Sequence, residues 1–326
     1  MPNILLLTKF RKPWNNGHYM AHALKTMGWH VDCIDTPSQI SSLPVFLETC
    51  NYKLALATKA EGITPEIIKK IQKKGTPFVI WFPDPVYPPK HIVKLGKVCD
   101  FFFTMSEGRI EDYKKNGVKK IAWLTQAVNP NFFPDIKLTA KDIKYYGSEV
   151  TFIGTLCGLP QYKPRRQMLK KVIDAGFKLK WWGPKPARKL KEIPFLLSKV
   201  CKSYGGRFVY LESFSKVVKA SKIFLSRDSY PDVRLSMSVR IYTALCCGAF
   251  YMCQKVEGIE TLFTPGKEIE IFEDYDEMID KIRYYLQHEQ KRNSIAQCGQ
   301  KKVLERHTYI HRFNEMFDIL KKEDIL

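Results

Sequence analysis

Short, uninterrupted apolar runs recur along this chain, and each is followed by a segment with helical periodicity. The first run, NILLLT at Asn3–Thr8, lacks polar alternation, which is typical of a central parallel strand covered on both faces. A loop at Arg11–Gly17, a predicted helix from about His18 to Met27 and a predicted strand at His30–Ile34 follow it. This order forms a βαβ unit, so the sequence predicts an α/β fold with parallel sheets.

The same alternation occurs in two series, which predicts two Rossmann-like domains. Further strands are expected at residues 54–58, 78–82, 100–104 and 121–124 in the first series, and at residues 150–154, 178–182, 208–211, 223–226 and 250–252 in the second. Residues 135–148 are interpreted as a connector and residues 185–203 as a basic helix. We therefore predict domains at 1–135 and 136–305, and a terminal helix at 306–326 that packs back on the first domain.

Charge and cysteine usage limit the functional classes. The chain has 53 Lys and Arg against 33 Asp and Glu, a net charge of +20, which favours an anionic partner such as a nucleic acid, a phospholipid surface or a phosphorylated substrate. Because most lysines are scattered along helices, simple solubility remains an alternative. The nine cysteines show no zinc spacing and no secretory leader precedes them, which predicts a reduced, cytoplasmic protein. No apolar run approaches the ~20 residues of a membrane span, so any membrane contact is expected to be peripheral, at the inner face.

The stretch from Ser221 to Gln254 is interpreted as a strand, a loop, a helix from about Ser238, a glycine stop and a second strand. Its arginines are Arg227, Arg234 and Arg240. Unpaired backbone amides at a helix start carry partial positive charge and attract phosphate groups. Ligands of open α/β sheets bind outside the carboxyl ends of the strands. We therefore expect a diphosphate site here, in a cleft between two domains that face each other.

Several motifs in this half resemble group 1 glycosyltransferases. They are S-x-R-I-Y-T-A-L-C-C-G-A-F, then GIETLFTPG and EIEIFEDYDEMI, and a terminal H-T-Y-x-x-R formed by His307, Thr308, Tyr309 and Arg312. The chain most resembles the CgeB-like branch, associated with spore maturation proteins. This resemblance implies a GT-B architecture, with the acceptor on the first domain and a nucleotide-diphosphate sugar on the second. It also implies no cofactor and no metal.

The resemblance assigns roles to residues of both domains. Gly154, Thr155, Arg166, Arg234, Ser238 and Arg240 are expected to bind the donor diphosphate, and Trp182, Tyr242 and Thr243 the nucleoside. Asn16 and Gly17 are expected on the acceptor side, with His18 or Asp84 as the base of an inverting reaction. Structural alternatives are a salt bridge of Arg234 or Arg240 with Asp228 or Asp232, a buried Trp182, a capping His18 and a turn at Asp84.

Two positions depart from the pattern of the family. Its paired glutamates are replaced by Leu235 and Thr243. We therefore consider three functions. The first is transfer of a sugar to an acceptor hydroxyl of an envelope glycan, a lipid or another anionic polymer. The second is glycosylation of a modified DNA base, as in phage enzymes. The third is a catalytically degenerate scaffold that binds sugar nucleotides. The sugar, the base, the stereochemical outcome and the oligomeric state are left open.

Overall fold

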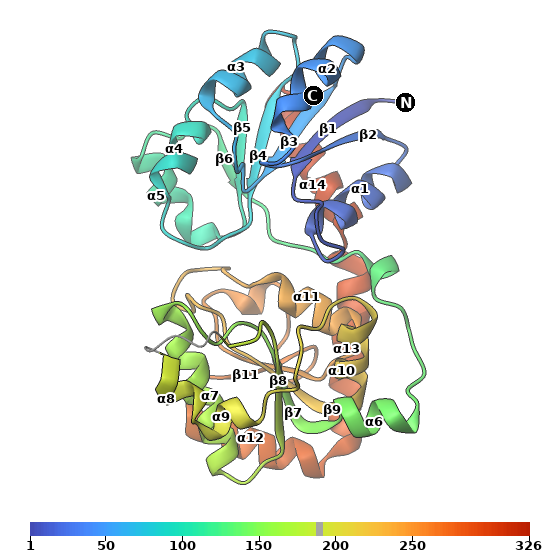
Figure 1. Ribbon diagram of the computed structural model, residues 1–326, viewed down its shortest axis with the longest axis vertical. Coiled ribbons are helices and arrows are strands. Elements are labelled where there is room, and N and C mark those ends of the chain that lie inside the picture. Colours follow the sequence, from blue (N-terminus) through green and yellow to red (C-terminus); the bar gives the residue numbers. More distant parts are fainter. Residues whose placement is uncertain (187–191) are drawn as a thin grey trace. The chain divides into compact units, whose positions relative to one another are not determined.

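The computed structural model describes residues 1–186 and 192–326 and divides them into two compact units (Figure 1). The first unit comprises residues 1–129, 232–238 and 307–326, and the second comprises residues 130–231 and 239–306. The loop 232–238 belongs to the first unit because the carbonyl of Arg234 accepts hydrogen bonds from the Gly108 amide (3.0 Å) and from Ser106 Oγ (3.4 Å). Each unit contains one parallel sheet, as the apolar runs predict.

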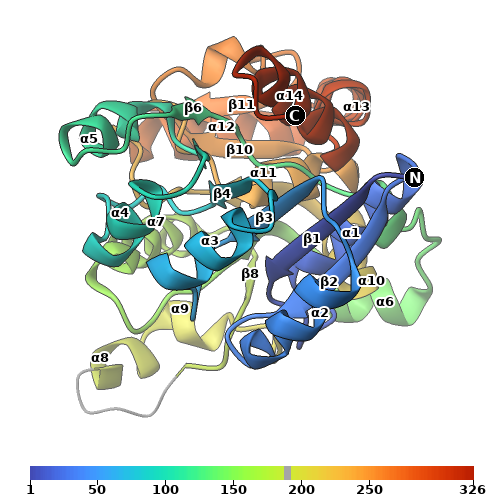
Figure 2. The same cartoon turned by 90° about the horizontal axis from the view of Figure 1, so that it is seen from above.

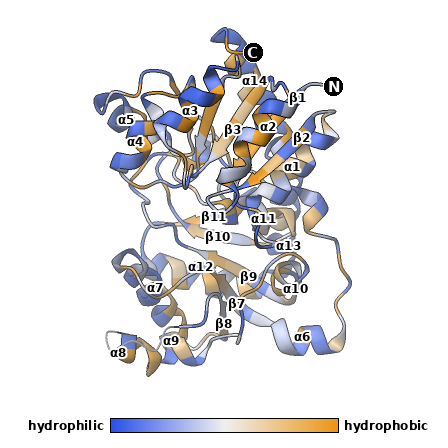
Figure 3. Ribbon diagram, turned by 45° about the horizontal axis from the view of Figure 1, so that its top comes forward, coloured by the Kyte–Doolittle hydropathy of each residue, from blue (hydrophilic) through white to orange (hydrophobic). Residues whose placement is uncertain are grey.

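The sheet of the first unit has the strand order β2-β1-β3-β4-β5-β6. Its strands are β1 (Asn3–Thr8), β2 (His30–Asp35), β3 (Leu54–Thr58), β4 (Phe78–Phe82), β5 (Phe101–Thr104) and β6 (Ile121–Trp123). Its helices are α1 (Asn16–Thr26), α2 (Leu43–Thr49), α3 (Pro65–Gln72), α4 (Lys90–Gly96), α5 (Ile110–Lys115) and α14 (Tyr309–Lys322). Figure 3 shows β1 and β3 mostly orange, in keeping with buried strands that present apolar side chains to both faces.

The two faces of this sheet are covered by different helices. Leu5, Ile80 and Phe102 pack on one face with apolar side chains of α2, α3, α4 and α5. On the opposite face Trp81 lies 6.0 Å from the ring of Tyr309 and 6.4 Å from that of Phe313, both in α14. The C-terminal helix is therefore part of the first unit, next to α1 (Figure 2).

The sheet of the second unit has the strand order β11-β10-β9-β7-β8. Its strands are β7 (Ser148–Ile153), β8 (Leu179–Trp182), β9 (Ser221–Ser226), β10 (Tyr251–Gln254) and β11 (Glu270–Phe272). Its helices are α6 (Ala140–Tyr146), α7 (Lys163–Asp174), α8 (Ile193–Leu196), α9 (Lys199–Lys202), α10 (Glu212–Ala220), α11 (Val239–Cys246), α12 (Tyr275–Gln287) and α13 (Glu289–Arg306). Its core joins Phe152, Trp181 and Leu225 of the strands to Met168 of α7 and Ile282 of α12.

Two local predictions are confirmed. Thr64 caps α3 and accepts a hydrogen bond from the Ile67 amide at 3.4 Å, with Pro65 at the first helical position. Gly248, with φ of +81°, adopts the left-handed conformation just after α11, where a side chain would add strain.

Three local predictions need correction. The predicted strand at residues 208–211 is absent; Gly206 and Leu211 have positive φ, so the chain turns away after a single bridge between Trp181 and Tyr204. The predicted connector contains helix α6, which begins with a capping box of Thr139 and Asp142. The predicted helix at 185–203 overlaps residues 187–191, which lie outside the described residues, and beyond them two short helices, α8 and α9, occur in its place.

Candidate active site

Three arginines of the second unit gather at the carboxyl edge of its sheet. Arg227 follows β9, Arg240 is the second residue of α11, and Arg165 lies in the first turn of α7. Strands β7 and β9 are neighbours, so the loops that follow them start side by side. We call Arg165, Arg227 and Arg240 the arginine cluster.

Arg165 connects the loops on both sides of this edge. Its side chain donates Nη1 to the Thr155 carbonyl (3.2 Å), Nε to the Arg227 carbonyl (3.1 Å) and Nη2 to Ser229 Oγ (3.0 Å). The residue is only 6% exposed, and its guanidinium lies over the ring of Tyr162. Burial, followed by the positive charge of Arg240, lowers the pKa of the Arg165 guanidinium to about 10, which leaves it charged at neutral pH.

Arg240 lies between the ends of β7 and β9. Its Nη1 donates to Ser226 Oγ at 3.0 Å, and its guanidinium carbon is 5.5 Å from the centre of the Phe152 ring. A Cβ on Gly154 would lie 3.1 Å from the Phe152 ring and 3.6 Å from that guanidinium carbon, so a side chain at this position would crowd the ring on which the cation lies.

The positive charge of this cluster is only partly balanced. Among the described residues, none of its three guanidinium groups forms an ion pair with a carboxylate. The buried Asp228 acts on Arg165 through its charge alone, and the Nε of Arg227 is buried without a hydrogen-bond partner. A buried donor and concentrated positive charge suit an anion with several oxygens, because guanidinium groups bind two such oxygens at once.

Comparisons with known proteins bear on the family and the fold. Residues 164–318 match the family model described as Glycosyl transferase-like. Starch synthase IV from Arabidopsis thaliana, whose catalytic domain was solved with ADP and acarbose, has a TM-score of 0.70 at 10% identity, with 99% of each chain covered. HepE from Anabaena, solved with UDP-glucose, has a TM-score of 0.66 at 13% identity, covering 99% of this chain and 100% of that one. Sucrose-phosphate synthase from Thermosynechococcus elongatus has a TM-score of 0.65 at 12% identity, with 99% of each chain covered.

The chain has the fold of GT-B glycosyltransferases. This confirms the predicted α/β class with two parallel sheets. No curated protein sequence matches the chain.

Two arginines assigned to the diphosphate in this GT-B chain have carboxylate partners. Arg166 forms an ion pair with the buried Glu192 (2.9 Å) and lies over the ring of Phe195. Arg234, in the first unit, forms an ion pair with Glu107. The sequence analysis considered Asp228 and Asp232 as structural partners of Arg234, and the structure gives Glu107 instead.

The residues assigned to the nucleoside lie inside the second unit. Trp182 and Tyr242 are both 0% exposed. The Trp182 ring packs 5.4 Å from that of Tyr146, and a Cβ on Gly205 would come within 2.4 Å of it. The Thr243 hydroxyl donates to the Val239 carbonyl of its own helix at 3.1 Å. These placements fit the packing alternatives, and the assignment to the nucleoside remains a prediction.

The residues assigned to the acceptor side lie at the carboxyl edge of the first sheet. Asn16 lines a cavity of about 310 Å³ there. A Cβ on Gly17 would lie 2.5 Å from the Lys9 carbonyl oxygen, so only glycine fits at this position. His18 Nε2 lies 2.8 Å from the Phe10 carbonyl oxygen. Asp84, which is not among the lining residues, forms an ion pair with Lys59 at 3.1 Å.

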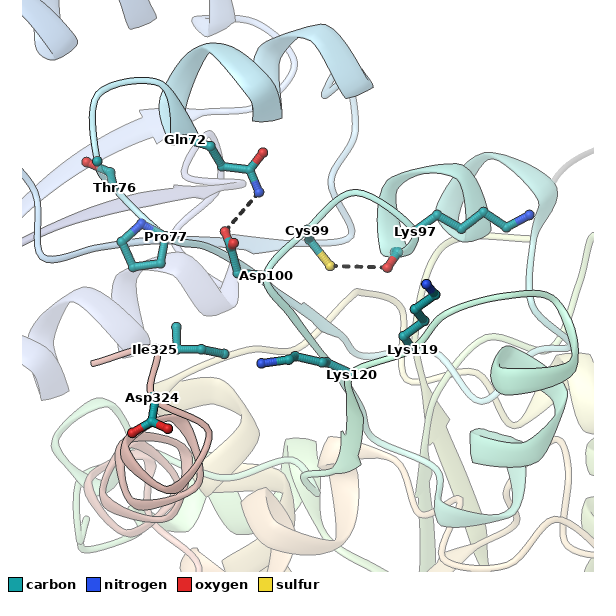
Figure 4. Close-up of a pocket in the computed structure, with 12 residues that line it drawn as sticks. Gln72, Thr76, Pro77, Lys97, Cys99, Asp100, Lys119, Lys120, Asp324 and Ile325 are labelled. Carbon is teal, nitrogen blue, oxygen red and sulfur yellow. Dashed lines mark hydrogen bonds between the residues drawn. The ribbon is translucent and has the colours of Figure 1, made fainter.

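A larger cavity, of about 620 Å³, lies at the opposite edge of the first sheet (Figure 4). Pro77, Asp100 and Lys120, which line it, directly precede β4, β5 and β6, so it opens at the amino ends of the strands. Figure 4 shows Gln72 donating to the Asp100 carboxylate, at 2.9 Å. Because open α/β sheets bind ligands at their carboxyl edges, we do not assign this cavity to the active site.

Among residues 1–186 and 192–326, no helix has the length and hydropathy needed to cross a membrane. In the same part of the chain, no three or more His, Cys, Asp or Glu side chains are grouped so that they could hold a metal ion.

Arg166 rather than Arg165 is the arginine of this helix that was assigned to the diphosphate from sequence, although the sequence contains a signal for the buried position of Arg165. Arg165, Met168, Leu169 and Val172 form the buried stripe of α7, with the spacing of one helical face. An arginine in an apolar stripe must find partners inside the protein, whereas Arg166, one position along, lies off that stripe. Helical periodicity therefore distinguishes the two arginines before the structure is known.

Proposed function

We propose that this protein is a glycosyltransferase that moves a sugar from a nucleoside-diphosphate sugar to an acceptor hydroxyl. The arginine cluster of the second unit is the observation that carries the proposal. Concentrated guanidinium charge at the carboxyl edge of a parallel sheet suits a diphosphate. The glycosyl transferase-like segment, residues 164–318, contains all three arginines of the cluster. The similar chains solved with UDP-glucose and with ADP support a nucleotide donor.

In this proposal the cluster acts mainly as the bond between sugar and diphosphate breaks. Negative charge then develops on the departing diphosphate, and Arg240 and Arg227 stabilise it together with the amides at the start of α11. Arg165 holds the Thr155 and Arg227 carbonyls in place and so positions both loops. Gly154 lets the backbone approach the phosphates. The proposal gives Arg166 and Arg234 no role in binding the diphosphate, because each already pairs with a carboxylate, Glu192 and Glu107 respectively.

The roles of single residues, the branch of the family, the sugar and the acceptor are also proposals. Ser238, which directly precedes α11, is kept as a diphosphate contact, and His18 or Asp84 as the base that accepts the acceptor proton. The CgeB-like branch is proposed from the S-x-R-I-Y-T-A-L-C-C-G-A-F pattern, the segments that follow it and the terminal motif that begins at His307. Metal-independent transfer of a hexose or pentose to an envelope glycan, a lipid or another anionic polymer is what that resemblance supports.

A donor panel tests the proposal. The melting temperature would be measured with UDP-, GDP-, ADP- and TDP-sugars, and the best donors would then be followed for hydrolysis or transfer. We expect Arg240→Ala to lower kcat/KM by about 100- to 1,000-fold, as loss of a donor aimed at developing charge does in other enzymes. Arg283→Ala, which removes an exposed arginine paired with Asp280, is the matched control and should not change the rate. Turnover that persists in Arg240→Ala would place the site elsewhere.

A second candidate is a scaffold that binds sugar nucleotides without turnover. Leu235 is buried and Thr243 bonds to its own helix, so neither position supplies the carboxylate expected from the family pattern. A donor that raises the melting temperature of the wild type but not of Arg240→Ala, with no hydrolysis or transfer, would support the scaffold. Release of free sugar or nucleotide above the background rate would exclude it.

A further inference from the structure

A groove on the second unit lies apart from the arginine cluster. It runs between α7 and the pair of short helices α8 and α9; α9 packs against α7 and α8 against α9, and the three helices lie together in Figure 1. Its volume is about 710 Å³, and its apolar lining includes Pro194, Phe195 and Val200. We call this the α7–α9 groove. The proposed sugar transfer gives it no role.

The rim of the groove is basic. Lys163, Arg166 and Lys170 line it from one face of α7, and Lys199 lines it from α9. Asp174 is the one carboxylate among the described residues that line the groove, and Lys170 and Lys199 share it. Because Arg166 is also paired with Glu192, which is not among the lining residues, four cations against these two carboxylates leave a net charge of +2. Lys170 and Lys199 are 68% and 73% exposed, so their charges reach the solvent.

Three aliphatic side chains project beside this rim. Leu159, Ile193 and Leu197 are 50%, 44% and 75% exposed. Ile193 and Leu197 lie one helical turn apart, since the Leu197 amide donates to the Ile193 carbonyl at 3.1 Å. Leu159 is held near them because the amide of its neighbour Gly158 donates to Glu192, which directly precedes Ile193, at 3.1 Å. Projecting aliphatic side chains thus border a basic rim over an apolar floor.

We propose that the α7–α9 groove and its projecting aliphatic residues dock this protein on an anionic phospholipid bilayer. Lysines near such a surface attract its negative headgroups, and aliphatic side chains enter the boundary between headgroups and acyl chains. A bilayer is favoured over single-stranded nucleic acid for a structural reason. Single strands bind by stacking on exposed aromatic rings, and Phe195, the aromatic residue of the lining, is only 6% exposed. The inference does not depend on sugar transfer.

Vesicle sedimentation with the full chain tests this proposal. The wild type should bind vesicles of phosphatidylcholine with phosphatidylserine but not phosphatidylcholine alone. Binding should weaken as ionic strength rises from about 0.1 M to about 1 M, because the screening length falls from about 10 Å to about 3 Å. The triple variant Lys163→Gln, Lys170→Gln, Lys199→Gln should bind about 100-fold more weakly, since each lysine contributes about fivefold near an anionic surface.

Matched controls separate this face from the general positive charge of the protein. The control triple variant Lys73→Gln, Lys74→Gln, Lys94→Gln removes the same charge from exposed positions of the first unit and should bind almost as the wild type does. Leu197→Ser should weaken binding about tenfold through lost apolar contact. Val45→Ser, at a position 61% exposed on α2, should not. Thermal melts check that all variants fold.

Three outcomes would overturn the proposal. The first is equal vesicle binding by the two triple variants, which would assign the attraction to overall charge. The second is no binding of the wild type to anionic vesicles at low ionic strength. The third is loss of duplex DNA binding in the groove variant while its vesicle binding is retained, which would assign the groove to nucleic acid.

Discussion

Replacing the two neighbouring arginines of α7 by methionine, one at a time, separates donor binding from folding. Arg165 is buried and joins the arginine cluster, whereas Arg166 is 27% exposed and pairs with Glu192. Methionine keeps most of the side-chain volume and removes the charge. We expect Arg165→Met to lose turnover with little change in stability, and Arg166→Met to lose stability with little change in turnover.

The stability terms for Arg165→Met oppose each other. The variant loses three hydrogen bonds, at about 1 kcal/mol each. It also removes a cation that the fold disfavours. The drop in the pKa of Arg165 from 12.5 to about 10 corresponds to roughly 3 kcal/mol against the charged form. The two terms nearly cancel, so the free energy of unfolding should stay within about 2 kcal/mol of the wild type.

Arg166→Met has no such offset. Its ion pair with Glu192 is lost, and the carboxylate of Glu192, which is 7% exposed, keeps the hydrogen bonds from the Gly158 amide and the Cys157 side chain but no cationic partner among the described residues. Breaking a fully buried pair costs about 3–5 kcal/mol; because Arg166 reaches solvent, we expect roughly 1–2 kcal/mol here. Urea unfolding followed by tryptophan fluorescence measures both variants.

Turnover should be affected in the opposite order, with a larger loss in Arg165→Met than in Arg166→Met. Arg165→Met frees the Thr155 and Arg227 carbonyls and removes one cation of the cluster, so kcat/KM should fall by about 100-fold or more. Arg166→Met should keep the wild-type value. Initial rates of donor hydrolysis, with isothermal titration of the nucleoside diphosphate, provide the comparison. If Arg166→Met lost turnover while Arg165→Met kept it, the assignment made from sequence would hold and the cluster would not be the diphosphate site.

Two further predictions concern single side chains. Asp35→Ala should destabilise the first unit by about 1–2 kcal/mol at neutral pH, because the carboxylate accepts hydrogen bonds from the Phe10 and Arg11 amides at 2.6 and 3.2 Å. Burial raises the pKa of Asp35, but its hydrogen bonds, foremost that from the Phe10 amide, leave the pKa in the folded protein below the ordinary value of 3.8. The loss of stability in Asp35→Ala should therefore be complete above pH 3.8 and should disappear as the pH falls through the pKa of the folded protein. A loss of stability that does not change with pH in urea unfolding would contradict this. Cys246 and Cys247 should resist alkylation in the native protein, because burial raises the pKa of each thiol to about 12. Mass spectrometry after alkylation of the native and of the denatured protein measures this. Equal rates of alkylation in the two states would contradict the prediction.

The sequence predicts the interior strands of the fold well, for a physical reason. A strand buried on both faces must be apolar at every position, and β3 and β4 occur at the predicted residues, 54–58 and 78–82. Capping signals are also local, as Thr64 and Pro65 illustrate at the start of α3. Such features depend on a few consecutive residues, so a single sequence contains them.

The elements that sequence analysis got wrong are short and lie at edges. The run FVYL at residues 208–211 has the composition of a strand, but the single bridge to β8 is made earlier, by Tyr204, and positive φ angles at Gly206 and Leu211 turn the backbone on either side of the run. Helix α6 has seven residues, too few for a clear period, although the Thr139 and Asp142 spacing marks its start. At an edge, neighbours in space decide the structure, and composition does not contain them.

The arginines of the site show the same limit. The sequence places cations at strand ends and helix starts but not the acids that pair with them. Arg234 pairs with Glu107, which is 127 positions away, and Arg166 pairs with Glu192, 26 positions away. Long-range ion pairs are products of the tertiary fold, so which arginines remain for an anion is known only after folding.

The arginine cluster is therefore best understood by contrast with other arginines of the same chain. Those at positions 109, 166, 234, 283, 292 and 312 each have a carboxylate partner. Arg165, Arg227 and Arg240 have none among the described residues, and burial, followed by the charge of Arg240, lowers the pKa of Arg165. Like charges held together destabilise the ligand-free protein. An anion that binds only the folded state recovers this free energy, so nucleoside diphosphate should raise the melting temperature of the wild type much more than that of Arg240→Ala.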